Sequence, residues 1–301
     1  MIGALPRAAS PSARSASDRP AVGLLAGAGR FPIVFAKKAK SLGIPVVAVG
    51  HASLTDPDLA DECQSFTLLR RASLGGAIRA FRRGRVGHWT MAGKFHKHLL
   101  FQRGRWLRLL PDWRFIRLWF FRPRRDNKDD TLLCALIAEF RAEGMECLSA
   151  LDLCPELLVR EGTLTRRPPT AAEFRDVQFG WNLAREMGRL DVGQSVMVRD
   201  RAVLAVEAIE GTDRAIARAG ELCRNAGFVV VKLAKPEQDM RFDVPTIGPA
   251  TVEAMRSAGA TALAVEAGKT ILLDEAETLA LADRYGLTVV AFRTESVAAG
   301  R

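Results

Sequence analysis

Short apolar runs alternate with helix-like segments along most of the chain, and this alternation limits the folds that it can adopt. The helix-like segments carry apolar residues every three to four positions, whereas the apolar runs have strand length. In the first half, strands are predicted at residues 21–26, 44–49, 66–69, 88–91 and 146–150, and helices at 31–42, 73–82 and 129–142. Such alternation is typical of a parallel sheet with crossover helices and predicts an α/β fold.

A polar, turn-rich stretch, REGTLTRRPP at residues 160–169, divides this pattern in two. Beyond it, helices are predicted at 170–187, 212–226, 250–257 and 275–285, and strands at 195–198, 202–207, 229–233, 262–265, 270–273 and 288–292. We predict a parallel-sheet domain over 21–159, a linker at 160–169 and a mixed α/β domain over 170–297. Residues 1–20 lack the apolar core of a secretory signal, and we expect a disordered tail there.

The composition excludes several classes of protein. The 301 residues are 48% hydrophobic and 26% charged, which indicates a soluble globular protein with a buried core and excludes a mainly disordered chain. No run approaches the roughly 18 apolar residues that a membrane-spanning helix requires. The five cysteines are scattered without a CxxC pair, which favours reduced thiols over disulfides or a zinc site.

Residues 70–125 carry a local net charge of +15, since this segment holds 16 of the 44 Lys and Arg residues and a single acid, Asp112. Asp112 is a candidate cap for a short helix in which Trp113, Ile116 and Phe120 recur at helical spacing. Three interpretations stay open: a core-facing helix with solvated arginines, a helix on an anionic membrane surface, and a nucleic-acid-binding patch. Because no nucleic-acid-binding motif accompanies the charge, we expect no nucleic-acid partner.

The loop Gly27-Ala28-Gly29-Arg30 joins the first predicted strand to the first predicted helix. Backbone N–H groups at such a helix start can bind phosphate or pyrophosphate oxygens. The dinucleotide fingerprint is incomplete, because Pro32 replaces its third glycine and His51 ends the second strand in place of a carboxylate. A nicotinamide site therefore has little support, and a tight structural turn and a contact with nucleotide phosphates stay open.

The segment at residues 232–248, KLAKPEQDMRFDVPTIG, concentrates charge. In an extended chain, Asp239, Arg241 and Asp243 alternate onto one face. Carboxylates beside lysines suit phosphate chemistry with Mg²⁺, which takes one or two carboxylates and completes its shell with water and substrate oxygens. A charged edge strand with ordinary ion pairs has the same spacing. Beyond this segment's prolines, a helix N-terminus is predicted at 246–250, where it faces an anion.

Three further clusters, at residues 188–194, 207–213 and 265–269, are polar where a core would be apolar. Each one alone is more typical of a turn or a helix cap than of a site. Together they place acids and glycines, such as Gly193 and Glu266, at the ends of several predicted strands. Open α/β sheets bind their ligands at such ends.

Five motifs, in this order, resemble those of a known family. They are AGAGRFP (26–32), KDDTLL (128–133), GRLDVGQSV (188–196), AVEAIEGTD (205–213) and KLAKPEQDMRFDVPTIG (232–248). The family is the magnesium-dependent UDP-2,3-diacylglucosamine pyrophosphatases of lipid A biosynthesis, which is unrelated to the calcineurin-like phosphoesterases. The resemblance extends from residue 21 to residue 297 and is most specific in the second half.

The resemblance implies a Rossmann-like N-terminal domain, a C-terminal α/β domain of its own type, and a substrate bound between them. It implies hydrolysis of the pyrophosphate in UDP-2,3-diacylglucosamine to UMP and 2,3-diacylglucosamine 1-phosphate. The implied location is cytoplasmic and peripheral, on the inner face of the inner membrane, and a homodimer is possible in this family. The family's essential aspartate, in an RxDxPTIG motif, falls on Asp243.

The residues and the resemblance together predict the site. We expect Asp243 to hold Mg²⁺ or to orient the attacking water, with Asp239 assisting, and Lys235 and Arg241 to stabilise charge on the pyrophosphate. The predicted substrate contacts are Gly27, Gly29, Arg30, Gly193, Gln194, Lys232, Thr246, Gly248 and Glu266. The expected partners are a lipid-linked UDP-sugar and an anionic membrane surface. The alternative is a nucleotide-binding Rossmann-like protein without hydrolase activity.

Overall fold

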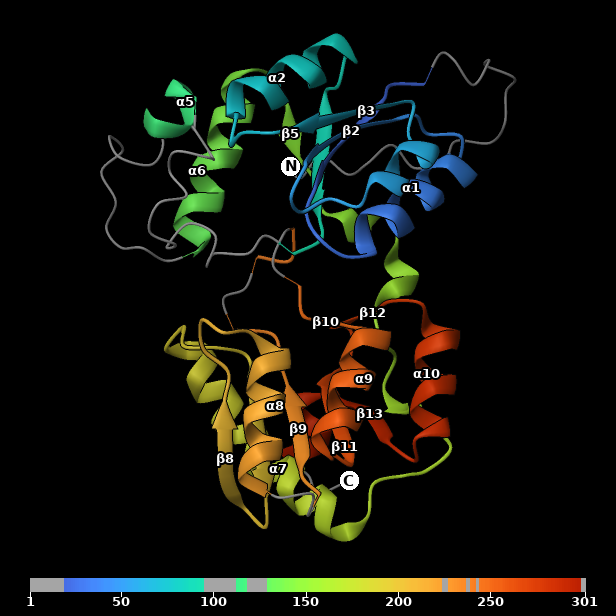
Figure 1. The fold of residues 1–301 in the computed structure, drawn as a ribbon, viewed down its shortest axis with the longest axis vertical. Coiled ribbons are helices and arrows are strands. Elements are labelled where there is room, and N and C mark those ends of the chain that lie inside the picture. The colour runs from blue at the N-terminus through green and yellow to red at the C-terminus, as the bar shows by residue number, and fades with distance from the viewer. Residues whose placement is uncertain are drawn as a thin grey trace. The chain divides into compact units, whose positions relative to one another are not determined.

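The chain folds into two compact units, residues 1–155 and 156–301, each described here by itself (Figure 1). The structure, a computed structural model, describes residues 19–94, 112–117, 129–223, 227–236, 239–241 and 244–298. Within these residues, no helix is both long enough and apolar enough to cross a membrane.

The first unit is built on a five-stranded sheet in the order β3-β2-β1-β4-β5, and all its strand pairs are parallel. The strands are β1 (Val22–Ala26), β2 (Val46–His51), β3 (Ser65–Leu69), β4 (His88–Ala92) and β5 (Glu146–Cys147). The helices are α1 (Phe31–Ser41), α2 (Leu74–Arg83), α5 (Trp113–Ile116) and α6 (Asp129–Ala142), with 3-10 turns η2 (Pro57–Glu62) and η4 (Ala150–Asp152). This strand order confirms the predicted Rossmann-like domain.

Aromatic side chains join the sheet of the first unit to its helices. Trp89 of β4, Phe81 of α2 and Phe140 of α6 are all fully buried. The ring centroids of Trp89 and Phe140 lie 4.2 Å apart, and those of Phe81 and Phe140 lie 5.6 Å apart. Aromatic pairs at such distances contribute about 1 kcal/mol beyond the area that they bury. This cluster therefore fixes α2 and α6 against β4.

Only part of the basic segment lies within the described residues, namely residues 70–94 and 112–117. Asp112 caps α5 as predicted, because its carboxylate accepts the backbone N–H of Phe115 at 2.8 Å. Trp113 is 68% exposed, whereas Arg114 forms an ion pair with Glu143 of the α6–β5 loop at 2.5 Å. The described part of the segment thus presents an exposed indole beside a neutralised arginine.

The second unit is built on a six-stranded mixed sheet in the order β6-β13-β11-β9-β7-β8. Its strands are β6 (Gly162–Thr163), β7 (Ser195–Arg199), β8 (Ala202–Val206), β9 (Val229–Lys232), β11 (Ala262–Glu266) and β13 (Thr288–Phe292). β9, β11 and β13 are parallel, whereas β6 and β7 run antiparallel to their neighbours. A separate parallel pair consists of β10 (Thr246–Ile247) and β12 (Ile271–Leu272). The predicted mixed α/β domain is confirmed.

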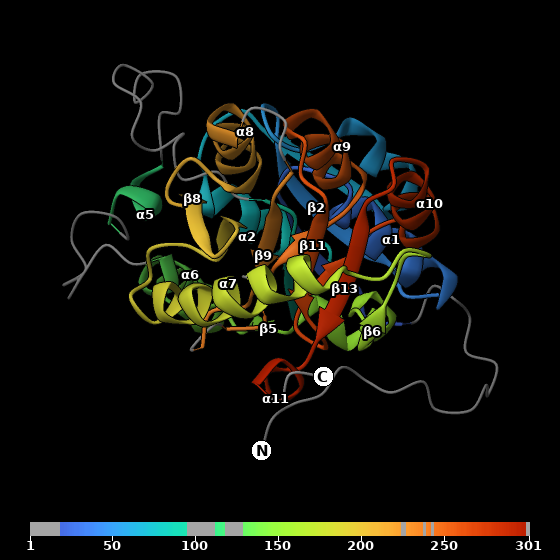
Figure 2. The ribbon, with the colours of Figure 1, turned by 90° about the horizontal axis from the view of Figure 1, so that it is seen from below.

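Helices cover both faces of this sheet (Figure 2). They are α7 (Ala171–Arg189), α8 (Thr212–Cys223), α9 (Pro249–Ala258), α10 (Glu275–Arg284) and α11 (Thr294–Ala298), and the turn η5 (Pro155–Leu157) precedes them. Val229 and Val231 of β9 pack with Trp181 of α7, whereas Val230 packs with Met255 of α9. Successive strand residues point to opposite faces, so the apolar run of β9 serves two cores.

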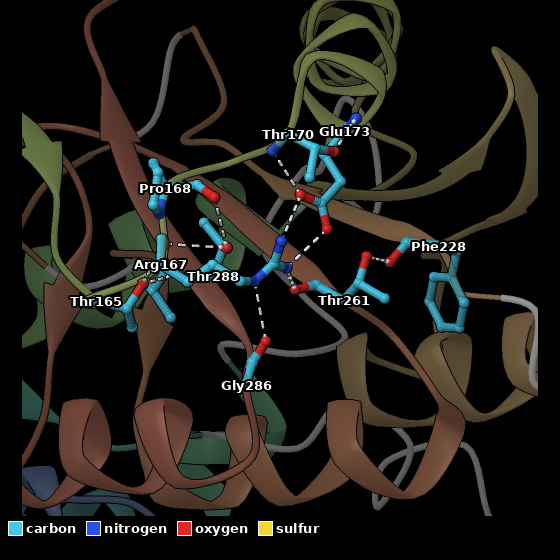
Figure 3. Close-up of polar contacts among 10 residues, drawn as sticks. Thr165, Arg167, Pro168, Thr170, Glu173, Phe228, Thr261, Gly286 and Thr288 are labelled. Atoms are coloured by element: carbon cyan, nitrogen blue, oxygen red, sulfur yellow. Dashed lines mark hydrogen bonds and ion pairs between the residues drawn. The ribbon is translucent and has the colours of Figure 1, made fainter.

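Residues 160–169, predicted as a linker, belong to the second unit instead. β6 pairs with β13, and the Arg167 guanidinium donates to both carboxylate oxygens of Glu173 at 2.8 and 3.0 Å. Arg167 also donates to the carbonyls of Thr261 and Gly286 (Figure 3). The prediction was wrong because the polar groups of this stretch form hydrogen bonds with buried groups at a sheet edge. A polar sequence by itself does not show whether its side chains bind other protein groups or water.

Candidate functional site

The carboxyl ends of four strands lie along one edge of the second unit's sheet, which we name the carboxyl edge. The parallel strands β9, β11 and β13 end there at Lys232, Glu266 and Phe292. β7 is antiparallel to β9, so its first residue, Ser195, pairs with Lys232. β8 runs back along β7 and ends directly before Glu207. Open α/β sheets bind ligands at this edge, which makes it the candidate site.

Lys232 is the most buried cation of this edge, at 4% exposure. Its Nζ donates to the hydroxyl of Thr212, the first residue of α8, and to the backbone carbonyl of Thr246, each at 3.1 Å. The Thr212 hydroxyl donates in turn to the carboxylate of Glu207 at 3.0 Å. A buried ammonium requires such acceptors, since its desolvation is otherwise costly. The structure thus brings together the predicted residues Lys232 and Thr246.

Gly193 and Gln194, both predicted substrate contacts, precede β7 and belong to the same edge. A Cβ atom on Gly193 would lie 2.0 Å from the carbonyl oxygen of Glu207, so the close approach requires glycine. The backbone carbonyl of Gln194 accepts the N–H of Leu233 at 2.9 Å. Gln194 Oε1 and Glu207 Oε2 are buried without a hydrogen-bond partner, which is unusual for polar atoms in an interior.

Gly193→Ala is expected to lower the free energy of unfolding by about 2 kcal/mol, because the added methyl group forces the Glu207 backbone away. Urea unfolding followed by circular dichroism measures the loss. Gly87→Ala is the matched control, since a Cβ atom there meets no heavy atom within 4 Å. Equal stability of the two variants would contradict the close packing of Gly193.

Lys235 forms an ion pair with Asp191, with 2.5 Å between Nζ and the carboxylate oxygen. Asp191 lies between α7 and β7 in the left-handed region, at φ 56°. The side chains of Lys235 and Asp191 are 18% and 29% exposed, so the pair is accessible from solvent. The predicted cation is therefore present near the carboxyl edge and is partly neutralised.

The sequence predicts that Asp239 and Arg241 share one face of an extended strand, but the structure places them in a turn. The Asp239 carboxylate accepts the backbone N–H of Arg241 at 3.0 Å and the Arg241 guanidinium at 2.5 to 3.0 Å. This local hydrogen bond favours a turn over a strand. Burial by itself raises the pKa of Asp239, but the hydrogen bonds and charge of Arg241 outweigh it and lower the pKa. Asp243 lies outside the described residues.

The other predicted contacts of the second unit lie on neighbouring elements. Thr246 begins β10, and Gly248 precedes α9, which begins at Pro249, within the range predicted for a helix N-terminus. Glu266 is 7% exposed and pairs with Lys269 at 2.8 Å. The carboxylate of Glu266 is thus neutralised by a cation from its own loop.

Gly27, Gly29 and Arg30 lie in the first unit, directly after β1. The N–H of Gly27 already donates to the Ala92 carbonyl at 2.8 Å, so that group is not available to a phosphate. A Cβ atom on Gly27 would also lie 2.8 Å from the carbonyl oxygen of Lys94. Gly29 adopts φ 90°, in the region that favours glycine, and Arg30 is exposed at the start of α1. Both glycines therefore have a structural explanation.

Sequence reasoning did not assign three residues of the carboxyl edge: Asp191, Glu207 and Thr212. They lie in two of the polar clusters, residues 188–194 and 207–213. The one sequence feature that could have indicated them is a polar residue next to the end of a predicted strand. Their partners are distant in sequence, since Lys232 is 20 residues from Thr212 and Lys235 is 44 residues from Asp191. No local pattern indicates which distant side chains meet.

Both units are similar to domains of one family. The family models of the LpxI N-terminal domain and the LpxI C-terminal domain match residues 21–157 and 160–290. UDP-2,3-diacylglucosamine pyrophosphatase LpxI of Caulobacter vibrioides is 31% identical over 278 residues, which are 89% of this chain and 96% of the relative. The chain belongs to the LpxI family. This membership confirms the LpxI family and the hydrolase class, and the dependence on Mg²⁺ stays a prediction. The carboxyl edge lies in the part of the chain that matches the LpxI C-terminal domain, and the glycine loop after β1 lies in the part that matches the LpxI N-terminal domain.

Proposed function

We propose that this chain hydrolyses the pyrophosphate bond of UDP-2,3-diacylglucosamine. Water attacks one phosphorus, the P–O–P bond breaks, and the products are UMP and 2,3-diacylglucosamine 1-phosphate. The observation that carries the proposal is the match to the Caulobacter pyrophosphatase, which covers 96% of that relative and both domains of this chain. A match of this extent supports a shared activity far better than one shared domain does.

The charges of the carboxyl edge support this chemistry. Lys232, Lys235 and Arg241 come from β9 and the segment after it, and Lys232 pairs with Ser195, two residues after Gly193. A pyrophosphate carries negative charge that grows on the leaving oxygen as the bond breaks, and fixed cations stabilise that charge. Lys232 is the best placed of the three for a fixed role, because two hydrogen bonds hold its ammonium.

The proposed cofactor is Mg²⁺, with Asp243 as its protein ligand. Among the described residues, no three His, Cys, Asp or Glu side chains are grouped to hold a metal ion, and the Asp239 carboxylate is engaged by Arg241. Mg²⁺ binds one or two carboxylates and otherwise water and phosphate oxygens, so the proposal requires only one aspartate as a protein ligand. When bound, Mg²⁺ polarises a phosphoryl oxygen and lowers the pKa of a bound water.

We also propose that the protein acts in the cytoplasm, at the anionic inner face of the inner membrane, where its lipid substrate resides. The exposed Trp113 and the arginines of α2 support this location, since indole rings enter the headgroup region and arginines bind lipid phosphates. A homodimer stays a prediction from the resemblance.

Purified protein incubated with UDP-2,3-diacylglucosamine and Mg²⁺ is expected to release UMP and the sugar 1-phosphate in equal amounts. EDTA should stop the release, and excess Mg²⁺ should restore it, because the metal stabilises charge in the transition state. Liquid chromatography of the products measures both effects. Binding of the substrate without release of UMP would overturn the proposal and favour the nucleotide-binding alternative.

A further inference from the structure

We propose that Glu207 and Thr212 are positioning residues that hold Lys232 and, through it, the start of β10. This inference rests on the proposed function, because it assigns to Lys232 a fixed place in the site. Glu207 directly follows β8, Thr212 begins α8 and Lys232 ends β9. Helix α8 contacts both β8 and β7, the strand that separates β8 from β9 in the sheet (Figure 1). The exposed fractions of the three residues are 8%, 9% and 4%.

The chemistry of the three groups sets the direction of every hydrogen bond. An ammonium only donates and a carboxylate only accepts, so the Thr212 hydroxyl between them has one arrangement. It donates its proton to Glu207 at 3.0 Å and presents a lone pair to Lys232 at 3.1 Å. The carboxylate therefore turns the hydroxyl so that its lone pair faces the ammonium. Charge-assisted hydrogen bonds of this kind are stronger and more directional than neutral ones.

Lys232, held in this way, also contacts β10. Its ammonium donates to the backbone carbonyl of Thr246 in β10, at 3.1 Å. β10 has only two residues, and on its other side the N–H groups of Ile271 and Leu273 donate to the carbonyls of Pro245 and Ile247. So short a strand depends on such flanking contacts for its position. Pro245, Thr246, Ile247 and Gly248 form the PTIG part of the RxDxPTIG motif, so the position of β10 fixes this part of the motif.

The test uses Thr212→Val, which removes the hydroxyl at nearly constant volume, and Thr212→Ser, which restores it. Without the hydroxyl, Lys232 loses an acceptor and its ammonium shifts. We expect kcat for UMP release to fall about 10- to 100-fold with KM changed less than about threefold, since small misplacements of a catalytic group cost this much. Thr212→Ser should keep at least about a third of wild-type kcat.

Thr288→Val is the matched control. Thr288 is a buried threonine like Thr212, and its hydroxyl donates to the Arg167 and Pro168 carbonyls at the other end of the sheet. It should leave kcat within about twofold of wild type, whatever it costs in stability. Equal loss of kcat in the Thr212 and Thr288 valine variants, or no rescue by serine, would overturn the proposal. If Thr212→Val does not fold, Glu207→Gln takes its place, with an expected loss of about tenfold.

Hydrogen exchange gives a readout that does not depend on activity. In Thr212→Val, peptides that contain β10 and β12 should exchange about tenfold faster than in wild type, whereas a peptide from the β7–β8 turn should be unchanged. Unchanged exchange at β10 would overturn the positioning role. If the wild-type chain releases no UMP, the proposed function fails, and exchange alone then decides whether Glu207 and Thr212 hold Lys232 and β10.

Discussion

Replacing Asp243 with asparagine is expected to reduce UMP release about 10³-fold or more. The substitution keeps the size of the side chain and removes its negative charge, which is what a carboxylate contributes to Mg²⁺ or to an attacking water. Stabilisation by a bound metal is worth several kcal/mol in the transition state, and about 4 kcal/mol corresponds to this factor. Single-turnover assays with UDP-2,3-diacylglucosamine measure the loss, and the melting temperature shows whether the fold is intact.

Two further aspartates give controls for Asp243. Asp200→Asn removes the same charge at the β7–β8 turn, at the end of the sheet away from the carboxyl edge, and should leave UMP release within about twofold of wild type. Asp239→Asn should have an intermediate effect, because in the structure Asp239 binds Arg241 and orients it. Near-full activity of Asp243→Asn would remove Asp243 from the site and with it the proposed metal ligand.

Arg167→Met is expected to lower the free energy of unfolding by about 3 kcal/mol. The guanidinium makes hydrogen bonds to Glu173 and to the carbonyls of Thr261 and Gly286, and the Glu173 side chain is only 12% exposed. Its removal takes the donor from two carbonyls and leaves the Glu173 carboxylate without its cationic partner, with the Thr170 N–H as its remaining backbone donor. Urea unfolding at pH 7 measures the effect. Arg166→Met is the matched control, because the Arg166 side chain is 92% exposed and its ion pair with Asp283 spans 3.5 Å.

The contribution of Arg167 should also depend on pH. Burial by itself raises the pKa of Glu173, but hydrogen bonds from Arg167 and the Thr170 backbone outweigh it and lower the pKa to about 2. A carboxyl with a lowered folded-state pKa stabilises the protein fully above its unfolded pKa, near 4.5, and loses this contribution as the pH falls toward 2. The gap in stability between wild type and Arg167→Met should therefore narrow below pH 4.5. A gap that is constant from pH 7 to pH 3 would contradict this assignment.

Most helices and strands of the fold were predictable because their signals are local. The apolar run that ends at Ala26 and the helix that begins at Phe31 have the expected type and nearly the expected bounds. The same holds for Asp112 as a helix cap, which depends on its position relative to the next three residues. The errors lie where polar residues make hydrogen bonds that the sequence pattern does not show: residues 160–169 join a sheet, and Asp239 bonds locally to Arg241 in a turn instead of a strand.

The sequence alone was sufficient to establish the order of elements, the two α/β domains and the family, because periodicity and ordered motifs are properties of neighbouring residues. Only the tertiary structure determined that the Thr212 hydroxyl stands between Glu207 and Lys232, that Gly193 packs on the Glu207 carbonyl, and that Lys235 pairs with Asp191. The physical reason is that strand order and register bring these groups together. Both depend on how the whole sheet assembles around its buried core, which no short stretch of sequence encodes.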